Sequence, residues 1–241
     1  MDGMQRQVEE LADQAAGLLH TSKRRRILIA LAGIPGSGKT TTAKYVAELL
    51  MSRGIRAGVC AMDGYHYPRS RLDAMTDPEE AHRRRGAPWT FDAKAAVGLV
   101  RDMRHAIDED RIVDQAVPTF DHAVKDPVEG GLMLVATTQV IILEGLYLLL
   151  AQPHWAEISS LVDLCWFVDV DASVARERLA RRHLQAGIVL SLEDGLLRAD
   201  TNDLPNGQEI LTHLQAPHKR ILSIPIPGES SPSWKVESSP R

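Results

Sequence analysis

The chain has 241 residues, of which 44% are hydrophobic and 25% are charged, and this balance predicts a globular protein with one main domain. Its formal net charge of −4 argues against a protein that binds nucleic acid mainly by electrostatic attraction, because such a protein needs surplus lysine and arginine. The longest apolar run, residues 140–151, contains Glu144 and is too short to cross a bilayer of about 30 Å, so we expect no membrane association.

The two cysteines, Cys60 and Cys165, each lie in an apolar stretch and are expected to be small core residues rather than a disulfide or metal pair. The first twenty residues contain several acidic side chains and no uninterrupted apolar run, so the sequence shows neither a signal peptide nor a transit peptide. These features predict a cytoplasmic protein.

The first predicted element is an amphipathic helix at residues 4–18, where apolar residues recur at three-and-four spacing. The basic run at residues 23–26 is interpreted as a solvated entry into the first strand, with a localisation signal as the less favoured alternative.

From residue 27 onward, short apolar runs alternate with helical patterns. The predicted strands are residues 27–32, 58–62, 113–119, 139–144, 164–169 and 221–224. The predicted helices are residues 40–50, 93–108, 155–161 and 172–185. Because parallel strands need crossover connections, this alternation predicts an α/β fold with a mainly parallel central sheet and helices on both faces.

Three segments are expected along the chain. Residues 1–26 form the N-terminal helix and basic entry, and residues 27–224 form the main domain, with a helical lid at about residues 176–206. Residues 225–241 are rich in Pro, Gly and Ser and are expected to be a disordered tail.

A glycine-rich segment, GIPGSGKT at residues 33–40, follows the first predicted strand and opens a helix, which is the context of a phosphate-binding P-loop. The backbone N–H groups and the lysine of such a loop surround phosphates, and its hydroxyl residue ligates Mg²⁺. The sequence therefore predicts a P-loop NTPase three-layer sandwich that uses ATP and Mg²⁺. The residues expected to hold the nucleotide are Gly33, Pro35, Gly36, Ser37, Gly38, Lys39, Thr40 and Thr41.

Other nucleotide-binding classes are less favoured, because the sequence contains neither an N-K-x-D guanine-reading motif nor an L-S-G-G-Q motif of ABC ATPases. ATP is therefore the expected phosphate donor.

Two carboxylates are predicted at the carboxyl ends of strands, where open parallel sheets bind ligands. Asp63 follows the second strand and is expected to accept the proton of an attacking hydroxyl; the alternative is a turn or helix cap. Glu144 interrupts an aliphatic run and is expected near Mg²⁺ together with Thr40; the alternative is a satisfied structural carboxylate.

The acceptor pocket is expected to draw on residues 82–92 and 118–126, two segments that combine aromatic and polar groups. From these segments we expect Arg85, Phe120 and His122 at the substrate, although a solvated helix face and an ordinary loop histidine are alternatives for Arg85 and His122.

A cluster of arginines marks the predicted helix 172–185. Arg178 and Arg182 are four residues apart and are expected to reach the same phosphate, with Arg178 also acting in catalysis. A purely solvated charged helix is the alternative.

Six motifs in this order resemble the superfamily of uridine kinase, phosphoribulokinase and bacterial-type pantothenate kinase. They are the P-loop, DGYH at 63–66, RRGAPWTFD at 84–92, PTFDHAVKD at 118–126, LEGLY at 143–147 and the arginine helix, and the resemblance covers residues 27–185. The DGYH and RRGAPWTFD pair is most similar to pantothenate-kinase-like proteins labelled as sugar or fructose-transport kinases.

The resemblance implies that Asp63 is the catalytic base, that Glu144 lies near Mg²⁺, that His122 lies at the acceptor and that Arg178 contacts phosphate. A second group of residues is also expected at the acceptor, namely Tyr65, His66 and Tyr147. The resemblance further implies that a polar stretch helps to hold nucleotide or acceptor: Arg198, Asn202, Asp203 and Asn206.

Two departures from the pattern argue against pantothenate itself. Trp89 stands where an acidic residue is expected, and Phe120 stands where pantothenate kinases resemble one another in having tyrosine. The leading hypothesis is therefore an ATP-dependent kinase for a hydroxyl group of a small metabolite. A nucleoside or nicotinamide riboside kinase and a non-catalytic ATP-binding regulator are the alternatives, and a homodimer stays open.

Overall fold

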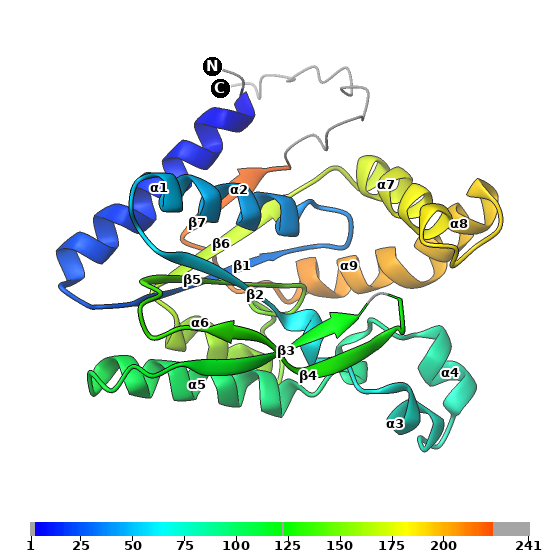
Figure 1. The fold of residues 1–241 in the computed structure, drawn as a ribbon. Helices are drawn as coiled ribbons and strands as arrows, with labels where there is room; N and C mark the ends of the chain where they lie inside the picture. Colours follow the sequence, from blue (N-terminus) through cyan, green and yellow to red (C-terminus); the bar gives the residue numbers. More distant parts are fainter. Residues whose placement is uncertain (1–2, 122, 224–241) are drawn as a thin grey trace.

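A five-stranded parallel sheet forms the centre of the computed structural model, which describes residues 3–121 and 123–223 (Figure 1). Its strands run in the order β2-β5-β1-β6-β7, and every neighbouring pair is parallel. Their bounds are Ile27–Gly33 for β1, Ala57–Ala61 for β2, Val140–Gly145 for β5, Leu164–Asp169 for β6 and Lys219–Leu222 for β7. The predicted parallel sheet is confirmed.

Helices cover both faces of this sheet because the inner strands carry apolar residues on both sides. Side chains of β1 such as Ile29 and Leu31 pack against α1 (Gly3–Ser22) and α2 (Lys39–Ser52). The alternate side chains, such as Leu28 and Ala30, pack against the other core, which includes α5 (Ala93–Asp108). Figure 1 shows α1 and α2 on one side of the sheet and α5 and α6 (Ile158–Leu161) on the other.

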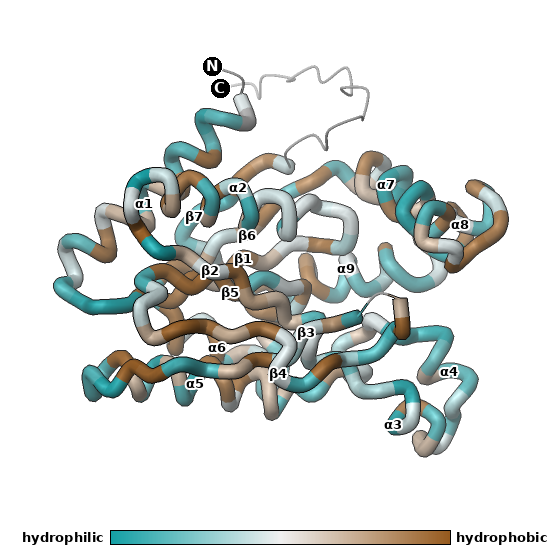
Figure 2. The backbone as a smooth tube through the Cα atoms, viewed as in Figure 1, coloured by the Kyte–Doolittle hydropathy of each residue, from teal (hydrophilic) through white to brown (hydrophobic). Residues whose placement is uncertain are grey.

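The N-terminal helix α1 is packed into the same core as the P-loop helix. Val8, Leu11 and Ala15 are buried against the sheet, and Gln14 accepts a 2.8 Å hydrogen bond from the indole of Trp166 on β6. Figure 2 shows that hydrophobic residues gather along the central strands. No helix of the described residues is long and apolar enough to span a membrane.

One predicted strand of the sheet has a different partner. Residues 113–119 were expected beside the parallel strands, but β3 (Gln115–Asp121) pairs antiparallel with β4 (Asp126–Leu134) in a separate hairpin. Along β3 only Val117 is fully buried, so the strand lacks the continuous apolar run that a central parallel strand needs. The prediction for β4 was missing because Pro127, Gly130 and Gly131 weaken its strand signal.

The remaining helices are short and surround the ends of the strands. The helices η1 (Met62–Tyr65), α3 (Arg69–Asp73), α4 (Pro78–Arg83) and η2 (Pro88–Thr90) follow β2, and η3 (Trp155–Glu157) precedes α6. After β6 come α7 (Ala172–Gln185), α8 (Leu192–Arg198), a π-helical turn at Ala199–Asp203 and α9 (Leu204–Thr212). The predicted tail at 225–241 lies outside the described residues.

Candidate active site

The P-loop lies between β1 and α2, as the sequence predicts, and its backbone needs glycine at two positions. Gly36 and Gly38 have φ values of 78° and 88°, a region that other residues rarely adopt. Gly38 also starts α2, where its carbonyl accepts a 3.0 Å hydrogen bond from the amide of Thr42. A Cβ on Gly33 would lie 2.6 Å from Oγ of Ser37, so the loop closes tightly on itself.

Lys39 and Glu144 lie buried at this loop. Nζ of Lys39 donates to the carbonyl of Ile34 at 3.3 Å, and Oγ1 of Thr40 donates to Oε1 of Glu144 at 3.1 Å. Glu144 therefore sits at the carboxyl end of β5 directly beside the first turn of α2. The expected pair of magnesium ligands, Thr40 and Glu144, is brought together.

Burial shifts the pKa values of Lys39 and Glu144 so that the uncharged form of each side chain is favoured. It lowers the pKa of Lys39, while the charges of Glu144 and Asp63 oppose this change. It raises the pKa of Glu144, opposed by Lys39 and by the hydrogen bond from Thr40. Because a phosphate would stabilise the ammonium group and a cation the carboxylate, the pair is suited to hold ligands of opposite charge.

Asp63 lies in η1, directly after β2, and its charge acts on both Lys39 and Glu144. The next residue, Gly64, packs so closely on β3 that an added Cβ would lie 2.3 Å from the carbonyl oxygen of Pro118. The close contact leaves room only for glycine next to Asp63. Three predicted residues, Lys39 of α2, Asp63 of η1 and Glu144 of β5, are thus close enough for their charges to act on one another.

An aromatic group lies next to Asp63. The ring of His66 lies 3.9 Å from the ring of Phe91 and 5.0 Å from that of Phe120 on β3, and Nδ1 of His66 is 2.8 Å from the carbonyl of Asp63. His122, also expected here, lies outside the described residues.

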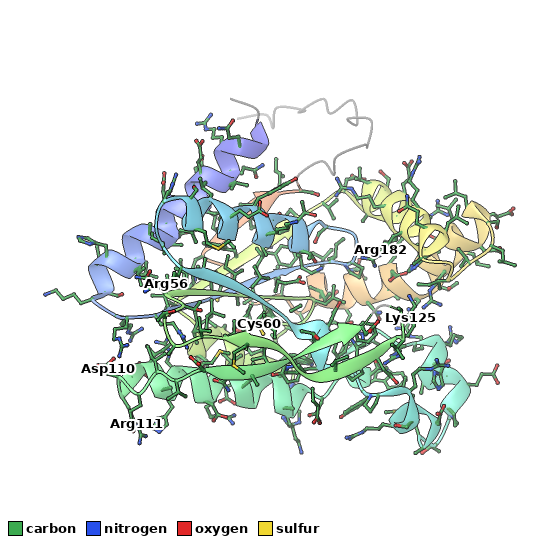
Figure 3. All side chains as sticks on the ribbon, viewed as in Figure 1. Arg56, Cys60, Asp110, Arg111, Lys125 and Arg182 are labelled. Atoms are coloured by element: carbon green, nitrogen blue, oxygen red, sulfur yellow. The ribbon has the colours of Figure 1, made fainter. Side chains whose placement is uncertain are left out.

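Arg85 holds the β3–β4 hairpin in place. Its guanidinium lies 5.4 Å from the Phe120 ring and donates to the carbonyls of Lys125 and Tyr67, at 2.5 and 2.8 Å, and to Asp126 at 3.0 Å. Figure 3 shows Lys125 at the turn of this hairpin. In this structure Arg85 therefore positions the hairpin, and its expected contact with the substrate stays a prediction.

Two predicted substrate residues point into the core instead. Tyr147 is fully buried and donates a 2.5 Å hydrogen bond to the carbonyl of Gly86. Tyr65 packs against the same core, and burial raises the pKa of its phenol. In this conformation both side chains support the walls of the site.

The two lid arginines occupy different environments. Arg178 is buried and donates to the carbonyl of Gly36 at 3.3 Å and to Oγ of Ser223 at 2.5 Å, while Ser223 donates to the carbonyl of Ser37 at 2.8 Å. Arg182 is exposed, and its charge acts on Lys39 and Glu144. It lies between α7 and the β1–α2 loop (Figure 3).

The polar stretch in the last part of the predicted lid forms hydrogen bonds with Arg84 and Arg85. Arg84 donates to the carbonyl of Thr201 at 3.2 Å and to Oδ1 of Asn206 at 2.9 Å, and Asn202 donates to the carbonyl of Arg85 at 3.3 Å. Sequence reasoning missed the role of Arg84, because no pattern in the sequence indicates a contact over more than a hundred residues. It also missed Ser223, an ordinary serine after a short strand.

Comparisons with known proteins show the family to which this chain belongs. The model of the Phosphoribulokinase / Uridine kinase family matches residues 28–188. The chain is 39% identical over 200 residues to "Putative uridine kinase C227.14" of Schizosaccharomyces pombe, covering 82% of this chain and 83% of that protein.

Two further proteins are similar. ATP-dependent kinase YFH7 of Lachancea thermotolerans is 36% identical over 190 residues, which cover 66% of this chain and 55% of that longer relative. The solved structure of a "putative fructose transport system kinase" from Silicibacter sp. TM1040 superposes with a TM-score of 0.74 at 30% identity, covering 88% of this chain and 98% of that one. This chain belongs to the phosphoribulokinase / uridine kinase family and is an ATP-dependent phosphotransferase with an alcohol group as acceptor.

Proposed function

We propose that the protein transfers the γ-phosphate of magnesium-bound ATP to a hydroxyl group of a small metabolite. The acceptor lies between Asp63 and the β3–β4 hairpin. The observation that carries this proposal is the meeting of the P-loop with the carboxyl end of β5, where Thr40 donates to Glu144 at 3.1 Å beside the buried Lys39.

The residues present fit Mg²⁺, since the Thr40 hydroxyl and the Glu144 carboxylate lie 3.1 Å apart and both offer the oxygen ligands that this ion prefers. Thr40 would ligate the ion, and Glu144 would hold it directly or through water. When bound, the ion neutralises charge on the phosphates of the nucleotide.

The chain's own residues then perform four tasks. The loop amides and Lys39 bind and orient the phosphates. Asp63 accepts the proton of the attacking hydroxyl, and Arg182 stabilises charge that develops on the transferred group. The hairpin positioned by Arg85 keeps the acceptor in line with the phosphate.

A nucleoside is one specific candidate for the small metabolite that accepts the phosphate. The rings of His66 and Phe120, with centroids 5.0 Å apart beside Asp63, offer an aromatic surface on which a base can stack. The similarity to a protein named as a uridine kinase supports this candidate, whereas the likeness to a protein named as a fructose transport system kinase supports a sugar.

An acceptor screen tests the proposal. ADP release is measured with Mg²⁺ and ATP against a panel of nucleosides, sugars and small hydroxy acids, for the parent and for Lys39→Met. We expect one compound class to raise ADP release above the rate in water, and we expect Lys39→Met and excess chelator each to abolish the rise. If no acceptor stimulates turnover while ATP still binds, the non-catalytic regulator replaces the kinase.

A further inference from the structure

A second pocket lies outside the phosphate-transfer site. It has a volume of about 430 Å³ and is lined by Tyr67, Arg71 and residues 88–89, 91–94 and 152–155. It contains no P-loop residue and neither Asp63, Arg85 nor Phe120, although part of the 82–92 segment lines it. Its lining includes Arg71 of α3 and Lys94 of α5, two helices that lie away from α2 (Figure 1). Phe91 forms part of its wall and also packs on the ring of His66, so the pocket adjoins the acceptor side of the site from behind.

Basic side chains from three separate segments line this pocket: Arg71 from α3, Lys94 from α5 and His154 from the loop before η3. Within the part of the chain that the structure describes, neither Arg71 nor Lys94 forms a salt bridge. Asp92, the acidic residue of the pocket, caps α5 by accepting a 2.9 Å hydrogen bond from the amide of Ala95.

The position of Lys94 is unfavourable for the helix that carries it. It is the second residue of α5, where the positive end of the helix dipole repels a cation. The N-cap carboxylate of Asp92 partly offsets this repulsion, whereas the first turn itself contains no acidic residue. Lys94 also lines the pocket, so its charge is available to an anionic ligand there.

Aromatic side chains provide the other half of the pocket. Trp89 is 48% exposed although it is a large indole, and Trp155 is almost wholly buried. The guanidinium of Arg71 lies 3.7 Å from the centroid of the Tyr67 ring, which holds this cation at the pocket wall. The exposed face of Trp89 is suited to stack against a flat ring.

The backbone beside the pocket is strained. His154 has φ 72° and ψ −59°, the conformation of a γ-turn that side chains other than glycine rarely adopt. Strain of this kind persists where surrounding structure over-determines a conformation, and it clusters at binding sites.

We propose that this pocket binds a small aromatic phosphate ester, with its phosphate between Arg71 and Lys94 and its ring on Trp89. Two cations suit the double negative charge of a phosphate monoester, and Arg71 can donate two parallel hydrogen bonds to its oxygens.

The test uses 4-methylumbelliferyl phosphate, whose flat bicyclic ring is fluorescent, in a polarisation titration of the full chain. A saturating non-hydrolysable ATP analogue and Mg²⁺ are present throughout, so the P-loop is occupied. We expect saturable binding, weaker competition by inorganic phosphate alone, and no comparable binding of the neutral 7-methoxy-4-methylcoumarin.

Charge-reversing variants locate the site. Lys94→Glu and Arg71→Glu should each weaken binding by about tenfold or more, because attraction becomes repulsion at close range. Trp89→Ala should weaken it by about threefold or more through lost stacking. Lys44→Glu, at an exposed lysine of α2, is the matched control and should change nothing. Because an acidic residue is favoured in the first turn of a helix, Lys94→Glu is expected to fold normally.

Three results would overturn the proposal. They are an absence of saturable binding, binding that Lys94→Glu and Arg71→Glu leave unchanged, and equal binding of the neutral coumarin. Binding that appears only without the ATP analogue and is lost in Lys39→Met would assign the probe to the P-loop instead. None of these results bears on whether the kinase reaction occurs, so this proposal and the proposed function fail separately.

Discussion

Oγ1 of Thr40 donates a 3.1 Å hydrogen bond to Oε1 of Glu144 and so joins the first turn of α2 to the carboxyl end of β5. The two residues are 104 positions apart in the chain. Their contact carries the proposed magnesium site, because it gathers a neutral and a charged oxygen ligand beside Lys39.

Glu144→Gln should reduce both turnover and the response to Mg²⁺. The amide keeps the size of the side chain but removes its charge, and changes of this kind around a metal typically cost about 10–100-fold in metal affinity or activity. ADP release measured against Mg²⁺ concentration checks this, with Glu48→Gln on the exposed face of α2 as the control. An unchanged magnesium dependence would make Glu144 a structural carboxylate.

Asp63→Asn should lower kcat by about 10²–10⁴-fold, the usual contribution of a general base, and should leave ATP affinity nearly unchanged. kcat, the ATP dissociation constant and the melting temperature are measured on one preparation. If the melting temperature falls and kcat stays within about threefold of the parent, well below a general-base contribution, Asp63 serves the fold and another carboxylate is the base.

Arg178→Ala and Arg182→Ala should affect different properties of the protein. Arg178 holds the carbonyl of Gly36 and the hydroxyl of Ser223, so its loss should lower both ATP affinity and the free energy of unfolding, the latter by about 1.5–3 kcal/mol. Arg182 is exposed, so its loss should slow turnover by about tenfold or more with little effect on stability. Chemical denaturation and single-turnover kinetics separate the two, and matching profiles would contradict this assignment.

Gly64→Ala and Gly98→Ala form a matched pair. A methyl group on Gly64 would collide with the backbone of Pro118, so we expect a loss of about 1–3 kcal/mol and a displaced Asp63 with reduced turnover. Gly98 lies inside α5 with nothing within 4 Å of the added carbon, so alanine there should stabilise by about 0.5–1 kcal/mol. Thermal unfolding of both variants tests this, and equal melting temperatures would refute the close packing on β3.

Both cysteines should resist alkylation in the folded protein. Burial, assisted by the charge of Glu144, raises the pKa of Cys60 to about 12, and burial raises the pKa of Cys165 to about 11. At pH 8 only about one Cys165 thiol in a thousand is then a thiolate, and fewer for Cys60. Iodoacetamide followed by mass spectrometry should label both only after denaturation; rapid native labelling of Cys60 would show that β2 opens.

The sequence predicted the parts of this protein whose signals are local. The apolar runs of β1 and β5 and the P-loop between β1 and α2 have patterns that depend on neighbouring residues alone. The β3–β4 hairpin was assigned wrongly because its place depends on contacts such as Arg85 with Asp126, which no periodicity reveals. The same limit explains why Arg178 and Arg182 looked alike in sequence, although their surroundings differ.

Ser223, at the end of the described chain, supports the P-loop near the beginning of the chain. It follows β7 and links Arg178 to the carbonyl of Ser37, so the P-loop obtains one of its supports from a residue 186 positions later. This support of the nucleotide site therefore forms only when β7 has joined the sheet. A chain shortened before β7 lacks this support of the P-loop, so we expect it to bind nucleotide more weakly than the full chain.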